Sequence, residues 1–437
     1  MLGIGIEADR VQWGVGNGGF HTEDIRRITK GVPTETPLLR IVYDCGSMRA
    51  GSVLQREIDA WADATGGYPF VEGETSVLVI SHFDRDHVNG LPRLKAVGFT
   101  PDYVILPFLS SFERVLQLVQ NIASKPRSFA DEQDRADDEF VDRLSSDPVA
   151  TVEGLWPKAE VILFEEPSDG PDDPESSPDT SAPAAGQGGE ERIEVSVEGR
   201  LGIRVTLTTA GGRPRRTALW EYRWREHRAV SAVPGLPAAL KSGLATVLGL
   251  TAQQVESPQA VWHAIAAKDK WKDVAALYRK LIGKKDLNPY SLVLWSGTGQ
   301  SGLRVNASRG VTLRGITPQQ DGALPPWLRS GGWLGTGDAD LRSPADVDLL
   351  FRRLSSRIDE VDVLNAPHHG SRHNSAVELY RRVPTRSGTV LTSADGKNGF
   401  GHPHGEMVKD ALLAGRTVVR VGDSAEQRFM WSVTVRA

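Results

Sequence analysis

Cysteine is nearly absent from this sequence, which contains only Cys45 among 437 residues. One thiol cannot form an internal disulfide or a cluster of thiolate ligands around zinc. Long hydrophobic runs are also missing, since no stretch reaches the roughly 18 apolar residues that a membrane-spanning helix needs. The first residues, MLGIGIEADRVQWGVG, lack a basic segment followed by an apolar one, so no signal peptide is expected. These absences predict a cytoplasmic protein without membrane contact.

Basic residues are slightly outnumbered by acidic ones, 51 to 56, which gives a net charge of −5. This balance argues against a protein that coats nucleic acid non-specifically, although a local basic groove stays compatible with it. With 39% hydrophobic residues, the chain is long enough to bury a large core and to contain more than one structural unit.

Short apolar strands separated by turns dominate two parts of the chain, residues 1–109 and 286–437. The apolar patterns there predict a helix and several strands in the first part and a helix in the second. The predicted strands are 38–47, 75–80, 102–107, 288–296, 331–340, 361–371 and 388–406, and the predicted helices are 53–64 and 343–354. The helix at 343–354 starts with a serine cap and a proline in its first turn.

Residues 110–285 differ in composition and are interpreted as an insertion between these two parts. Within it, residues 165–191 are rich in proline, glycine, serine and acidic residues, with almost no apolar side chains. Such a stretch cannot bury a core and is predicted to be disordered. Residues 199–283 are predicted to form a hairpin followed by helices.

Four side chains of the kinds that bind metals crowd the sequence HFDRDH, directly after the apolar run 77–80. They are His82, Asp84, Asp86 and His87. Alternate residues that leave a strand point the same way, so His82 and Asp84 can share one metal ion. Asp86 and His87 lie one turn further on and can reach a second ion. Imidazole and carboxylate together suit Zn, Mn or Fe.

Three later segments repeat the pattern of an apolar strand followed by a side chain of a kind that binds metals. WLGTGDAD contains Asp338, VDVLNAPHHGS contains His368 and His369, and FGHPHGE contains His402 and His404. Ligands at the ends of several strands can converge on one edge of a sheet core. An aspartate between two cations can bridge them at a spacing of about 3.5–4 Å.

These motifs together resemble the metallo-β-lactamase superfamily. HFDRDH is similar to its HxHxDH signature with Asp84 in place of the second histidine, a variant that resembles the soluble metallo-β-lactamase-like domain of the ComEC competence proteins. The same order of motifs continues along the chain, with VGNGG, YDCGS, NPYSLVL, TGDAD, PHHGS and SADGKNGFGHPH. The resemblance covers roughly residues 1–107 and 286–437, and it does not include the insertion.

The resemblance implies an α+β fold, an αββα sandwich with a large, partly disordered insertion, and two divalent ions, Zn or Mn, at the sheet edge. It implies that His82 and Asp84 serve one ion, that Asp86 and His87 serve the other, and that Asp338 bridges them. His368 is assigned to complete the second site, with His369 as the alternative. Asp86 would also orient the attacking water, and His402, or the spare histidine of the 368–369 pair, would protonate the leaving oxygen or hold a phosphate oxygen. Supporting or substrate-contacting roles are assigned to Asp44, Asn288, His369, Ser371 and Asn398.

One feature of the superfamily is missing from the sequence. Its third motif supplies a histidine between the first cluster and the bridging aspartate. In that interval the sequence has only His227 and His263, both within the insertion and without matching context, and Asn288 stands nearest the expected place. One metal site is therefore expected to lack a ligand or to be completed by water.

The charges of the proposed ligands favour an anionic substrate. Asp84, Asp86 and Asp338 bring −3 and two divalent ions bring +4, which leaves about +1 at the site. Binding to a metal also lowers the pKa of a water molecule towards 7. The site therefore predicts a hydrolase that cleaves phosphodiesters with a metal-bound hydroxide, and in particular a nuclease with a nucleic-acid substrate. Two alternatives stay open: hydrolysis of a small cyclic nucleotide, thioester or lactone, and a degenerate scaffold whose insertion binds a protein partner. The oligomeric state is not assigned.

Three smaller signals have competing interpretations. Cys45 is interpreted as a small buried residue rather than a nucleophile, and His21 as a surface or capping residue. The stretch RPRRTALWEYRWREHR could stack bases of single-stranded nucleic acid on its aromatic residues. The alternation of its residues also fits a half-buried strand with an aromatic face in the core, which is favoured here.

Overall fold

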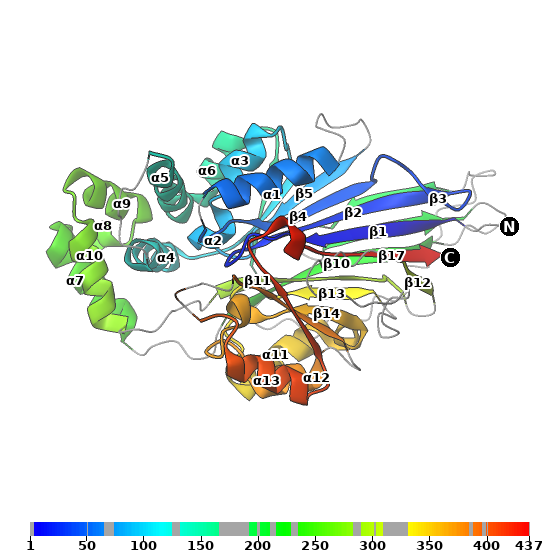
Figure 1. The fold of residues 1–437 in the computed structure, drawn as a ribbon. Helices are drawn as coiled ribbons and strands as arrows, with labels where there is room; N and C mark the ends of the chain where they lie inside the picture. Colours follow the sequence, from blue (N-terminus) through cyan, green and yellow to red (C-terminus); the bar gives the residue numbers. More distant parts are fainter. Residues whose placement is uncertain are drawn as a thin grey trace.

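Two β-sheets face each other, and helices cover the outer face of each sheet (Figure 1). This is a computed structural model, which describes residues 4–49, 51–64, 74–124, 132–165, 192–198, 202–209, 216–228, 235–282, 290–300, 303–308, 331–383, 388–395, 399 and 401–436. The mixture of helices with two multi-stranded sheets agrees with the predicted α+β class.

Within the described residues, the first sheet contains nine strands in the order β12-β17-β1-β2-β4-β5-β6-β7, with β3 paired to β2. The run from β4 to β7 is parallel, whereas β12, β17, β1 and β2 pair antiparallel. The strands are β1 (Gly5–Gln12), β2 (Phe20–Thr29), β3 (Val32–Pro33), β4 (Leu39–Cys45), β5 (Thr75–Val79), β6 (Tyr103–Pro107), β7 (Glu160–Phe164), β12 (Arg304–Ser308) and β17 (Phe429–Arg436).

The second sheet has eight strands in the described parts of the chain, in the order β16-β15-β14-β13-β11-β10-β9-β8. Here the run from β13 to β16 is parallel. Its strands are β8 (Arg192–Val197), β9 (Ile203–Thr208), β10 (Arg216–Arg228), β11 (Tyr290–Gly297), β13 (Gly332–Gly335), β14 (Val361–Asn365), β15 (Thr389–Ser393) and β16 (Thr417–Val421).

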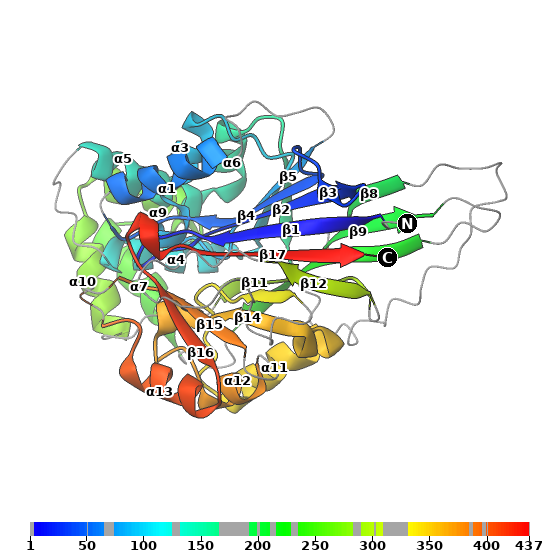
Figure 2. The ribbon, with the colours of Figure 1, turned by 45° about the vertical axis from the view of Figure 1, so that its right-hand side comes forward.

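The central core lies between the sheets, and a second and a third core lie beneath the outer helices. In β5, Val77 and Val79 face the opposite sheet, while Leu78 faces the helices on the other side. The first sheet is covered by α1 (Gly51–Ala64), α3 (Leu91–Ala96), α5 (Glu132–Ser146) and α6 (Pro148–Leu155). The second is covered by α11 (Pro344–Leu354), α12 (Val377–Arg382) and α13 (Gly405–Leu413), as Figure 2 shows.

The predicted secondary structure around the motifs is largely confirmed. Each predicted strand overlaps an observed one, and the predicted helix 53–64 corresponds to α1, which begins two residues earlier. The serine cap of α11 is present, since Oγ of Ser343 accepts a hydrogen bond from the amide of Asp346 at 3.1 Å.

The segment 110–285, interpreted above as an insertion, divides into two kinds of structure. Strand β7 joins the first sheet, and the β9–β10 hairpin with β8 joins the second. Five helices instead pack together around their own apolar cluster: α4 (Ser111–Ser124), α7 (Leu236–Leu248), α8 (Ala252–Val255), α9 (Pro258–Ala267) and α10 (Trp271–Ile282). Of the stretch 165–191, predicted to be disordered, residues 166–191 lie outside the described residues.

The aromatic stretch in β10 belongs to the core. Trp220, Tyr222 and Trp224 are buried between the sheets, which confirms the core interpretation over the single-strand platform. His21 is also buried, and its ring stacks on Trp333 at 4.0 Å between centroids, so the surface interpretation of His21 was wrong. His21 is buried because β2 lies between β1 and β4 in the first sheet and the second sheet covers its inner face.

Among the helices that the structure describes, none is long and apolar enough to cross a membrane.

Candidate metal centre

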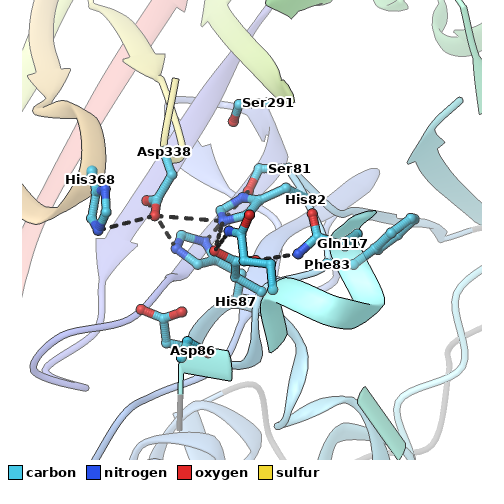
Figure 3. A network of polar contacts seen from close by, with 12 residues as sticks. Ser81, His82, Phe83, Asp86, His87, Gln117, Ser291, Asp338 and His368 are labelled. Carbon is cyan, nitrogen blue, oxygen red and sulfur yellow. Dashed lines mark hydrogen bonds and ion pairs between the residues drawn. The ribbon is translucent and has the colours of Figure 1, made fainter. Parts of the chain in front are cut away.

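The carboxyl ends of parallel strands from both sheets meet at one edge of the sandwich. Residues 81–88 follow β5, Asp338 follows β13, and His368 and His369 follow β14. Figure 3 shows the side chains of His82, His87, Asp338 and His368 turned toward one another. The edge at which parallel strands end is the usual place for ligand sites in such sheets.

Three buried side chains form a first group that can hold a metal ion: His82, His87 and Asp338. Their ligand atoms all lie within 4.8 Å of one another. Nε2 of His87 is 3.2 Å from Oδ1 of Asp338, and Nε2 of His82 is 3.6 Å from Oδ2. Two imidazoles and one carboxylate are a ligand set that Zn and Mn accept.

Asp44 and Ser81 decide which nitrogen of each histidine faces this group. Asp44 accepts hydrogen bonds at 2.7 Å from both the amide and the hydroxyl of Ser81, and at 2.8 Å from Nδ1 of His87. Because the Ser81 hydroxyl donates its proton to Asp44, it must accept from Nδ1 of His82, which is 2.8 Å away. Both histidines therefore carry a proton on Nδ1, and Nε2 is the nitrogen that faces Asp338.

The two Nε2 atoms are what a metal would use. Both are buried, and neither forms a hydrogen bond of good geometry. A buried polar atom without such a bond is costly, and an ion between these nitrogens and Asp338 would remove that cost. Burial and His87 lower the pKa of His82, but the carboxylates of Asp338 and Asp84 outweigh them and raise it to about 9. The same carboxylates that hold a proton on His82 would attract a metal cation, which must displace that proton to bind.

A second group consists of Asp86, His87 and His369. Nε2 of His369 lies 2.9 Å from Oδ2 of Asp86. Burial raises the pKa of Asp86, but the hydrogen bond from His369 and the nearby imidazoles outweigh it and lower the pKa to about 2. The two groups share His87, whose Nδ1 is held by Asp44, so its Nε2 can bind an ion in only one of them.

The two adjacent histidines, either of which was expected to complete the second site, lie in different surroundings. His369 belongs to the group with Asp86, whereas His368 belongs to neither group and its Nε2 lies 3.7 Å from Oδ2 of Asp338. Both residues have left-handed backbone angles, with φ of 47° and 56°. Two such residues in succession cost roughly 1–3 kcal/mol each, and strain of this kind concentrates at functional sites. The unusual turn aims both imidazoles at the sheet edge.

Asp84 borders the first group without belonging to it. Its Oδ2 is 3.6 Å from Nε2 of His82, and its Oδ1 accepts a hydrogen bond from Gln117 of α4. The side chain is partly exposed, unlike the three members of the group. A small displacement would bring Asp84 to an ion held by His82, so its expected role is compatible with this position.

His402 lies beside the histidine pair but differs from the expected proton donor. Its ring centroid is 5.3 Å from that of His368. Burial and the imidazoles of His369, His368 and His404 lower the pKa of His402 to about 3. At neutral pH the ring is therefore uncharged, which suits a hydrogen-bond donor to an anion better than a general acid.

The remaining predicted residues support loops or lie outside the described chain. Ser371 is buried, and its hydroxyl accepts from the amide of His373 at 3.2 Å. Neighbouring Asn374 donates to the backbone carbonyl of Asp338 at 3.3 Å. Asn288 and Asn398 are outside the described residues. Within the insertion, His227 is buried with Nε2 3.0 Å from the carbonyl of Asp340, and it belongs to neither metal group.

A glycine lets the strands approach closely enough to form the site. Gly337, directly before Asp338, has a left-handed φ of 51°. A Cβ atom there would collide with Oγ of Ser291 and would lie 2.8 Å from Cβ of Ser81. The TGD motif therefore needs glycine for both backbone conformation and space.

A small cavity adjoins the two groups. The residues that line it include His87, Asp338, His369, Gln12 and His21. Its volume of about 30 Å³ holds roughly two water molecules. Water therefore has room next to the candidate ligands.

Two contributors to the site carried no expected role from the sequence, Ser81 and Gln117. Ser81 directly precedes His82, so its place in the sequence could have predicted a contact with the metal-binding cluster. No sequence feature predicts the role of Gln117, because it reaches Asp84 only through the packing of a helix more than thirty residues away along the chain. Cys45 is buried, and burial raises the pKa of its thiol, which agrees with a packing role.

Comparison with known proteins does not place the chain in a family. A scan against protein-family models finds no match, and a search of curated proteins finds no significant match. The chemistry of the site is therefore argued from its own residues.

Proposed function

We propose that this chain is a metal-dependent hydrolase that cleaves phosphodiester bonds, and specifically a nuclease. The observation that carries this proposal is the pair of buried Nε2 atoms of His82 and His87, both turned toward Asp338. Their tautomers are set by Asp44 through direct and Ser81-mediated contacts, which is how metal-binding histidines are usually held.

The donor set supports Zn or Mn, and two ions in preference to one. The first ion would be held by His82, His87 and Asp338, and the second by Asp86 and His369. Bound there, a divalent ion supplies Lewis acidity and lowers the pKa of a coordinated water. The ligand carboxylates only partly neutralise two such ions, which favours an anionic substrate over a neutral one.

The layers of the molecule support a relationship to the metallo-β-lactamase superfamily, and within it to ComEC-like domains. Helices cover the outer faces of two packed sheets, and the candidate ligands lie where parallel strands of both sheets end. The order of the motifs along the chain supports the same assignment.

The chain's own residues have distinct tasks in this proposal. Asp86, held by His369 at 2.9 Å, accepts a hydrogen bond from the attacking water and orients it. His402 is neutral, so it donates an N–H to a phosphate oxygen and orients the substrate. The left-handed turn at His368 and His369 keeps both imidazoles in place for these contacts.

Cleavage assays test this function. Purified protein is incubated with labelled single-stranded DNA and RNA in the presence of Mn²⁺ or Zn²⁺, beside Asp86→Ala and the surface control Asp348→Ala. The proposal expects metal-dependent cleavage that the Asp86 variant loses and the control retains. A folded wild-type protein that binds metal but cleaves neither polymer would overturn the nuclease. Cyclic nucleotides, thioesters and lactones would then be the next substrates to assay.

A further inference from the structure

Helix α4 touches the candidate metal centre directly, although it belongs to the helical part of the 110–285 segment. In Figure 1, α4 lies next to α2 (Arg85–Val88), the short helix that contains Asp86 and His87. Figure 3 shows Gln117 reaching from α4 toward the histidines. The contacts concern Asp84, the one predicted ligand of the HFDRDH motif that lies outside both metal groups.

Two buried glutamines on α4 hold the Asp84 carboxylate. Nε2 of Gln117 donates to Oδ1 of Asp84, and Nε2 of Gln120 lies 3.5 Å from Oδ2. Gln117 and Gln120 are 9% and 7% exposed, so their amides act where water competes little. The same Oδ2 lies 3.6 Å from Nε2 of His82. The carboxylate is thus fixed on its α4 side and faces His82 on the other.

The orientation of Gln120 is itself determined by a second helix. Oε1 of Gln120 accepts a hydrogen bond from the hydroxyl of Tyr278 in α10 at 3.1 Å. An amide that accepts through its oxygen on one side presents its NH₂ group on the other, which here is the side of Asp84. The chain of contacts therefore runs from α10 through α4 to Asp84 and His82.

Further contacts attach the backbone of the metal-binding loop to the same region. Nδ2 of Asn121 donates to the carbonyl of Phe83 at 2.8 Å, directly before Asp84. Arg85 forms an ion pair with Asp138, and Arg93 with Asp137 at 3.0 Å, both on α5. Side chains of α4 and α5 therefore hold residues 83–93 in place, in addition to the strands beneath them.

We propose that Gln117 and Gln120 are positioning residues that place Asp84 as a further carboxylate ligand for the ion held by His82. This inference rests on the proposed metal centre. A carboxylate ligand uses one oxygen for the metal, and donors in the surrounding protein orient the other. Gln117 orients Oδ1 and leaves Oδ2, which Gln120 also contacts at 3.5 Å, turned toward His82. The helical part of the 110–285 segment is then a component of the metal centre.

Metal titration of the full chain tests the proposal. The double variant Gln117→Met/Gln120→Met removes both amide donors and keeps unbranched side chains of similar size, so the packing of α4 is retained. The control is Gln259→Met, because Gln259 of α9 also donates to an aspartate, Asp147, at 3.3 Å in the same helical region. Affinity for Mn²⁺ and Zn²⁺ is measured by calorimetry, and unfolding of the metal-free proteins by urea.

The proposal expects the double variant to bind metal about 10- to 100-fold more weakly than wild type, with an unchanged urea midpoint. Gln259→Met should bind like wild type. Tyr278→Phe should show a smaller loss than the double variant, since it frees Gln120 but leaves Gln117 in place. Wild-type affinity in the double variant would overturn the positioning role and leave the metal centre intact. A wild-type protein that binds no metal would overturn the centre itself, together with this inference.

Discussion

Oδ2 of Asp44 lies 2.8 Å from Nδ1 of His87, so a residue at the end of one strand fixes a histidine that follows the next strand. The same carboxylate accepts from Ser81, whose hydroxyl faces His82. Asp44 thereby orients both imidazoles of the first metal group while its own oxygens stay engaged with protein donors. The interpretation of Asp44 as a supporting residue fits this position.

Replacing Asp44 by asparagine should weaken metal binding about 10- to 100-fold. The amide oxygen of asparagine cannot accept from all three donors that Asp44 serves, and its NH₂ group repels Nδ1–H of His87. Calorimetric titration with Zn²⁺ and Mn²⁺ measures the change. Asp348→Asn is the control, because Asp348 pairs with Arg382 on the surface. Equal affinities for the wild type and the Asp44 variant would contradict the role of Asp44.

Gly337→Ala should lower stability and metal affinity more than Gly415→Ala, a substitution with similar backbone strain far from the site. Gly337 and Gly415 both have left-handed φ angles, 51° and 77°, but only Gly337 has neighbours that a Cβ would strike. Gly415→Ala should therefore cost about 1 kcal/mol from backbone conformation alone. Gly337→Ala should cost more and should also lose metal affinity, which urea unfolding and metal titration measure together. Equal losses in the two variants would show that space around Gly337 is not limiting.

Glu23 should contribute to stability in a pH-dependent way. Burial raises the pKa of Glu23, but Arg10, 2.9 Å away, and hydrogen bonds from His21 and Ser296 outweigh burial and lower it to about 2. A carboxyl whose pKa is lower in the folded state than its ordinary 4.5 stabilises the fold fully above that pH. This contribution is then lost as the pH falls from about 4.5 toward about 2.

Urea unfolding of wild type and Glu23→Gln across this pH range checks the contribution. The difference in free energy of unfolding between the two proteins should be largest near neutral pH and should shrink below pH 4.5. Other carboxyl groups titrate in both proteins, so their effect cancels in the difference. Glu256→Gln, an exposed partner of Lys241, should show no such trend. A pH-independent difference would mean that folding does not lower the pKa of Glu23, and would contradict this prediction.

Trp224→Ala should destabilise the fold by about 3–5 kcal/mol, because it removes a fully buried side chain from the core between the sheets. Leu413, which is 77% exposed, provides the control, and Leu413→Ala should change stability by less than about 0.5 kcal/mol. Urea unfolding measures both. A Trp224 variant of wild-type stability that has lost affinity for single-stranded nucleic acid would instead support the platform interpretation.

The local features of this chain were predictable from sequence because they depend on near neighbours. The apolar run before His82, the glycine before Asp338 and the serine cap at Ser343 each mark an element by its own residues. Parallel strands bring their carboxyl ends together within one sheet, so the meeting of the TGDAD and HHGS segments follows from strand direction. The HFDRDH segment follows a strand of the other sheet and joins them through the packing of the two sheets.

The finer arrangement depends on tertiary contacts that spacing does not encode. Sequence spacing could not distinguish His368 from His369, since both follow β14 and a left-handed turn decides which imidazole reaches Asp86. The attachment of Gln117 to Asp84 depends on how α4 packs. The burial of His21 depends on the second sheet, which covers β2 from the other side.

Metal content is the most direct test of the central claim that His82, His87 and Asp338 hold an ion. Wild type and Asp338→Ala are stripped with chelator, incubated with Zn²⁺ or Mn²⁺, freed of excess metal and measured by elemental analysis, with folding checked by circular dichroism. The account predicts at least one ion per wild-type chain and a clear loss in the variant. A folded wild-type protein that retains no ion, or an Asp338 variant that retains as much as wild type, would contradict it.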